Sequence, residues 1–142
     1  MNSPFSTPTE KAVRSLLSER HKKTCEWLAA VMRWRRELTS LQRILDFCLS
    51  RHFDFQSEMN DYQNVLLYYR EELLDSILSR LHLHKDRILQ LLAGPCRESP
   101  STYFTEHEQI LNEADALGQQ IRGYCGEIYD LIRRATGGKS TL

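Results

Sequence analysis

The chain contains no glycine or proline between Pro8 and Gly94, although a proline precedes this stretch and both residue types follow it. These two residues weaken helices most, so their absence over such a length predicts helix throughout. One continuous helix of this length would extend about 130 Å, at about 1.5 Å per residue, so a compact domain must turn inside it. The stretch therefore predicts two long helices joined by a turn.

The first helix is expected over about residues 8–51. Thr7 can cap it, Pro8 suits the first helical position, and Glu10 completes a capping box. The seam of this helix follows alternating steps of four and three, as in a helix packed antiparallel in a bundle or coiled coil, and it is apolar except at Arg20 and Thr24. Its apolar residues are Val13, Leu17, Trp27, Val31, Trp34, Leu38, Leu41 and Leu45.

The second helix is expected over about residues 55–93 and the third over 101–136, with a frayed tail at 137–142. Asp54 or Ser57 could cap the second helix. Each helix has one apolar face. The second carries Tyr62, Leu66, Tyr69, Leu73, Ile77, Leu81, His84, Ile88 and Leu91; the third carries His107, Ile110, Ala114, Leu117, Ile121, Tyr124, Ile128, Leu131 and Ala135.

The expected fold is all-α: one domain of residues 1–142, formed by an antiparallel bundle of three long helices. The bundle has four helices if the first one breaks near residues 18–24. The second helix also carries a second apolar stripe, which a thin three-helix bundle leaves uncovered, and this predicts a homodimer. The stripe consists of Leu67, Leu74, Leu78, Leu89 and Leu92.

Composition restricts the partners of this chain. Nineteen basic and nineteen acidic residues cancel, which argues against a dedicated nucleic-acid binder. The four cysteines form no CxxC pair, and they suggest reduced thiols in the cytoplasm. No run of about 18 apolar residues occurs, so a membrane partner is not expected.

Two histidines, His82 and His84, lie two positions apart in the second helix. At about 100° per residue, His84 falls at the centre of the apolar face and His82 points away from it. Counting residues along antiparallel helices sets His84 level with further polar residues on the other two helices. The buried polar layer expected from this register consists of Arg20, Thr24, His84, Glu106 and His107, with His21 beside it.

This layer has two main interpretations. It is either a hydrogen-bonded network in which Arg20 pairs with Glu106 and fixes the register of the helices, or a transition-metal site. The metal ligands would be His21, His84, His107 and Glu106. A cation such as Arg20 would repel a metal ion. An acid–base role for the same groups is a third alternative.

The segment MRWRRE, residues 32–37, places arginines around a tryptophan. The same register sets these arginines level with Glu71 and Glu72, which predicts interhelical salt bridges rather than binding of a polyanion. Trp27 and Trp34 are expected in the core, packed on glycines of the third helix. The glycines in question are Gly118, Gly123 and Gly126.

Several short segments follow one another in a distinctive order: HKKTCEWL at 21–28, WRREL at 34–38, YQN at 62–64 and EHE at 106–108. In this order the chain resembles a group of small, uncharacterised all-helical bacterial proteins. Thr24 stands where that group has a histidine. The resemblance implies a helical bundle without a known activity.

We therefore expect a non-enzymatic cytoplasmic protein that needs no cofactor and acts through protein contacts, with its own homodimer first. Neither nucleic acid nor membrane is expected as a partner. The alternative is a helical bundle that binds a transition-metal ion between its helices.

Overall fold

The computed structural model describes residues 8–94 and 101–137, and all regular structure in these ranges is helical, so the chain is all-α. The predicted cap at Thr7 and nearly all of the predicted frayed tail lie outside the described residues. The elements are α1 (Pro8–Ser50), α2 (Gln56–Tyr68), the π-helical segment η1 (Tyr69–Leu73), α3 (Leu74–Ala93) and α4 (Ser101–Ala135). No described helix is long and apolar enough to cross a membrane.

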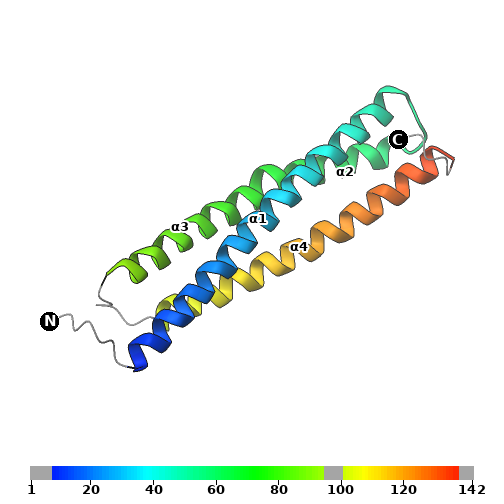
Figure 1. Cartoon of the computed structure of the whole chain (residues 1–142). Helices are drawn as coiled ribbons and strands as arrows, with labels where there is room; N and C mark the ends of the chain where they lie inside the picture. Colours follow the sequence, from blue (N-terminus) through cyan, green and yellow to red (C-terminus); the bar gives the residue numbers. More distant parts are fainter. Residues whose placement is uncertain (1–7, 95–100, 138–142) are drawn as a thin grey trace.

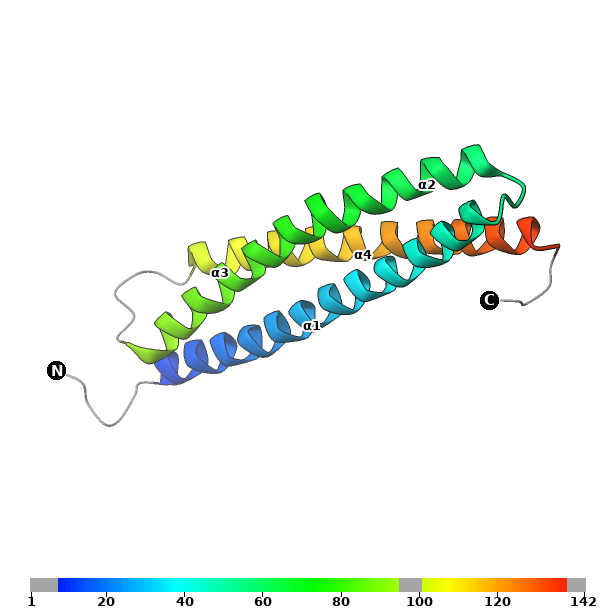
Figure 2. The same cartoon turned by 90° about the horizontal axis from the view of Figure 1, so that it is seen from above.

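The helices lie side by side along one elongated molecule (Figures 1 and 2). The start of α1, the end of α3 and the start of α4 share one end, and α1 turns into α2 at the other end (Figure 1). Side-chain contacts agree with this arrangement. Near the first end, Arg14 Nη1 donates to the Leu92 carbonyl at 2.8 Å, and towards the other end Gln63 donates to Asp46.

The first helix continues without interruption through residues 18–24, where a break was the alternative to three helices. The irregularity lies instead in the second long helix, where η1 joins α2 to α3. A π-helical segment adds one residue to a turn and rotates every later side chain about the helix axis. The second long helix is therefore continuous from residue 56 to residue 93, but its apolar face changes phase at η1.

This change of phase decides which leucines of the second long helix are buried. Its buried positions advance from Tyr69 to Leu74 in one step of five residues, and then to Ile77 in a step of three. Leu74 is fully buried in the chain's own core, although it was predicted to belong to the uncovered stripe. Leu78 and Leu92 pack partly against the core. Only Leu67 and Leu89 of the predicted stripe are exposed, so the stripe is much smaller than expected.

The turn between α1 and α2 uses backbone conformations that the sequence did not reveal. His52 and Phe55 have positive φ values of 56° and 69°, a left-handed conformation that is uncommon for residues other than glycine. Phe55 precedes α2 as its N-cap and makes no side-chain capping hydrogen bond. The predicted caps, Asp54 and Ser57, are therefore wrong.

The buried core has two parts. The larger one extends from Leu28 on α1 to the turn and on to Leu131 and Ile132 near the end of α4. The smaller one consists of Leu17, Ile88 and Tyr103. Along each helix, the buried polar residues lie between the two parts. They are Thr24 on α1, His84 on α3 and His107 on α4.

One tryptophan–glycine contact agrees with the prediction and two do not. A Cβ added to Gly118 would lie 2.5 Å from Cζ2 of Trp34, so this glycine lets the indole approach α4 closely. Nothing lies within 4 Å of the corresponding position at Gly123 or Gly126. Trp27 packs edge-on against Trp34, with ring centroids 6.0 Å apart. Tryptophan packing therefore explains Gly118 only.

Candidate polar site in the bundle core

The centre of the site is a hydrogen bond between two buried histidines. His84 Nε2 lies 2.8 Å from His107 Nδ1, and the two residues are 4% and 1% exposed. His82 is exposed. The helical phase therefore predicted correctly which of the two neighbouring histidines faces inward. The register predicted correctly that His84 meets His107 within about one turn.

Tyr103 packs against both histidine rings. Its ring stacks on the His84 ring, with centroids 4.3 Å apart and planes only 4° from parallel. Burial raises the pKa of the Tyr103 hydroxyl, so the phenol is neutral at physiological pH. The hydroxyl lies near the Thr24 hydroxyl, which acts to lower its pKa, but it makes no hydrogen bond of normal geometry with a described residue.

Both histidines are held in the neutral form. Burial is the largest cause for His107, and the neighbouring His84 and Arg20 act in the same direction, which lowers its pKa to about 4. Burial also lowers the pKa of His84, against the opposing effect of Glu106. A neutral imidazole carries one N–H and one acceptor nitrogen, so one ring donates and the other accepts in the bond between them. Which ring donates depends on what the two outer nitrogens meet.

Two ion pairs flank the histidines, and they differ from the predicted one. Arg87 Nη1 donates to Glu106 Oε2 at 2.6 Å between α3 and α4. Arg20 Nη2 lies 3.8 Å from Glu108 Oε1 between α1 and α4. The predicted pair of Arg20 with Glu106 is therefore wrong. Glu106 and Glu108 lie about 100° to either side of His107 around the axis of α4, so one faces α3 and the other faces α1.

The predicted buried layer contains fewer buried residues than expected. Thr24, His84 and His107 are buried, and the Thr24 hydroxyl donates to the Arg20 carbonyl at 2.8 Å. The side chains of Arg20 and Glu106 are only partly buried, at the edges of the layer. The layer is thus an apolar-walled pair of imidazoles with an ion pair on either side.

The candidate metal ligands do not converge on one point. His84 and His107 are in contact, but Glu106 is bound to Arg87, and His21 Nε2 lies 3.8 Å from the sulfur of Cys25 on its own helix. Within residues 8–94 and 101–137, no group of three or more histidine, cysteine, aspartate or glutamate side chains is arranged to hold a metal ion. The geometry thus brings together two of the four candidates.

Three residues of the site were not predicted: Arg87, Tyr103 and Phe104. Phe104 lies under the Arg20 guanidinium, 5.8 Å from its carbon to the ring centroid. The sequence did carry a signal for two of them. Tyr103 lies one turn before His107 on the same face of α4, and the register that set His84 near His107 also sets Arg87 level with Glu106.

Two grooves reach the histidine pair from opposite sides of α4. One lies between α3 and α4, has a volume of about 270 Å³, and is lined by His84, Arg87 and Glu106 among others. The other has a volume of about 430 Å³ and lies between α1 and α4, with Arg20 and His107 in its wall. The hydrogen-bonded imidazoles therefore connect the two grooves through the core.

The arginine-rich segment of α1 forms one salt bridge to the second long helix. Arg35 pairs with Asp75, not with Glu71 or Glu72 as predicted. Glu71 pairs with Arg70 on its own helix. An interhelical salt bridge is therefore present, as predicted. The register placed Arg35 level with residue 70, but its partner Asp75 lies five residues further along the second long helix, a little over one turn.

Comparison with known proteins found no relative of this chain. The sequence matches no protein-family model and no curated protein, and the structure matches no solved structure.

Proposed function

We propose that the chain is an antiparallel bundle of three long helices that acts through contacts with other proteins, first with a second copy of itself. The observation that carries this proposal is a set of four large apolar side chains that are exposed on the second long helix. Leu83 is 70% exposed, and Tyr68, Leu67 and Leu89 are also exposed. Large apolar side chains left in water on one element favour association, because association removes them from solvent.

Two further observations support a binding role without a cofactor. The imidazoles of His84 and His107 are buried, and His84 Nε2 and His107 Nδ1 are occupied by their bond to each other, so these two nitrogens do not act as a free acid or base. The described cysteines Cys25, Cys48 and Cys125 are free thiols, which fits a reducing cytoplasm. Burial raises the pKa of Cys125 to about 11, so this thiol is a poor nucleophile.

Light scattering at tens of micromolar tests the proposal. We expect the mass of a dimer for the unmodified chain and of a monomer for Leu83→Glu, which replaces one of the four exposed apolar side chains with a charge. Ser40→Glu is the control, because Ser40 is an exposed polar residue on α1 and not on the second long helix. A monomeric mass for the unmodified chain would exclude the homodimer.

The alternative function is a metal-binding bundle, and the contact between His84 and His107 is the observation that favours it. Metal analysis separates the two functions. Protein purified without chelator and then dialysed should retain about one equivalent of metal ion if the alternative is correct. A His84→Ala variant should then lose that ion, whereas His82→Ala should keep it.

A further inference from the structure

Two residues that line the groove between α1 and α4 each have a buried nitrogen atom without a hydrogen-bond partner among the described residues. These atoms are Nε of Arg20 and Nε2 of His107. Leaving a buried polar atom unpaired costs about 1–3 kcal/mol, so such atoms call for an explanation. Two of them in the wall of one groove point to a ligand that pairs with both.

No residue in the described ranges 8–94 and 101–137 pairs with these atoms. His107 already uses Nδ1 in its bond to His84, which leaves Nε2 for one further partner. The Arg20 guanidinium lies over the Phe104 ring, and its contact with Glu108 is 3.8 Å, beyond hydrogen-bond length, and uses Nη2. Arg20 Nε is therefore a donor that no neighbouring carboxylate occupies.

We propose that this groove binds a small carboxylate, which accepts hydrogen bonds from Arg20 Nε–H and His107 Nε2–H. Arginine always donates, and a carboxylate offers two acceptor oxygens that match two N–H groups. The guanidinium excludes a metal ion from the same position, because like charges repel. The proposal is independent of the homodimer.

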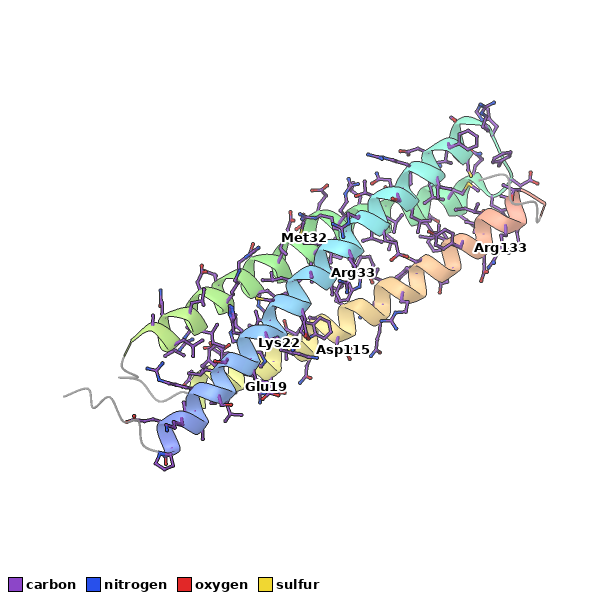
Figure 3. The ribbon with its side chains drawn as sticks, viewed as in Figure 1. Glu19, Lys22, Met32, Arg33, Asp115 and Arg133 are labelled. Atoms are coloured by element: carbon purple, nitrogen blue, oxygen red, sulfur yellow. The ribbon has the colours of Figure 1, made fainter. Side chains whose placement is uncertain are left out.

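The charges around the groove limit how tightly it binds. Lys22 and Glu19 lie on the exposed part of α1 beside α4 (Figure 3), and Lys23 pairs with Glu26 at 3.8 Å. The cationic and anionic residues of the lining are equal in number, so no net field attracts the ligand. Binding therefore depends on the two proposed hydrogen bonds, and we expect a dissociation constant of about 1 mM.

A bound carboxylate would also determine the tautomer of both histidines. If His107 donates from Nε2, its Nδ1 must accept, and His84 must then donate from its own Nε2. His84 Nδ1 is left as an acceptor, beside the Arg87 guanidinium in the groove between α3 and α4. Occupancy of one groove is thereby communicated to the other through a pair of imidazoles.

Nitrogen NMR of protein labelled on its histidines tests this inference. Sodium acetate is titrated at pH 7, with sodium chloride as the control for ionic strength. We expect a saturable shift for His107 with acetate only, ending in the tautomer with a proton on Nε2 of both His107 and His84. Shifts that fail to saturate, or that chloride reproduces, would overturn the proposal.

Two substitutions of Arg20 locate the site. Arg20→Gln should weaken acetate binding roughly tenfold, the loss of one charge-assisted hydrogen bond. Arg20→Lys keeps the cation but lacks the planar set of donors, and it should weaken binding as well. Arg80→Gln, on the wall of the opposite groove, is the matched control and should leave the affinity within about twofold. Unchanged acetate affinity in a folded Arg20→Lys variant would contradict the assignment.

Discussion

The two parts of the core are built from different chemistry. The larger part is apolar from Leu28 to Ile132, and its side chains interlock along three long helices. The smaller part is bounded by the layer of Thr24, His84 and His107 and, among the residues that the structure describes, contains three fully buried side chains that are not in the layer. The larger part supplies stability through buried area, whereas the polar layer supplies a specific pairing of helices.

Buried polar atoms without a hydrogen-bond partner lower the stability of one end of the molecule. Four buried polar atoms have no hydrogen-bond partner among the described residues, and all belong to residues at the end of the molecule where α1 begins. They are Arg20 Nε, His21 Nδ1, Tyr103 Oη and His107 Nε2. An apolar core contains no such atoms. We expect the end that carries them to open more readily than the rest.

The largest expected effect compares two fully buried leucines. Leu41→Ala, in the larger part of the core, should lower the free energy of unfolding by about 3–5 kcal/mol, because a cavity remains among closely packed neighbours. Leu17→Ala should cost about 2–3 kcal/mol, because the smaller end can relax around the cavity. Denaturant unfolding of both variants measures the difference. Equal costs would show that the two ends are equally rigid.

The second prediction is that the free energy of unfolding depends on pH through His107 in the polar layer. The pKa of His107 is about 4 in the folded protein and 6.5 in the reference state, so the unfolded chain binds the proton more readily. Stability is therefore greatest above about pH 6.5 and is lost as pH falls towards 4, by about 2–3 kcal/mol. Unfolding curves between about pH 7 and pH 4 test this. His107→Gln should remove most of the slope, whereas His82→Ala should retain it.

The third prediction compares neighbouring histidines on one helix. His84→Ala removes a buried ring and strands Nδ1 of His107, so it should cost about 1–3 kcal/mol. His82→Ala removes an exposed ring and should change stability by less than about 0.5 kcal/mol. If the site holds metal, chelator should reduce the difference between the two variants. A difference that persists in chelator identifies a structural network.

The smallest expected effect concerns glycines on α4. Gly118→Ala should destabilise the fold by about 1 kcal/mol, because the new methyl group forces Trp34 to move. Gly126→Ala meets open space and should stabilise the helix by about 0.5–1 kcal/mol. Thermal melts of both variants measure these two changes in stability. A stabilising Gly118→Ala would mean that the indole yields easily.

The sequence alone determined the helices, because helix formation depends on local signals. The absence of glycine and proline up to Gly94 predicted helix over nearly all of residues 8–93, and periodicity placed His84 inside and His82 outside. The tertiary structure decided the partners. The π-helical segment rotated Leu74 into the core. Arg20 on α1 forms its ion pair with Glu108 rather than with Glu106. Pairing between helices changes with a shift of one or two residues along the helix, or with a rotation of about 100° around it, and the local signals that predict a helix report neither.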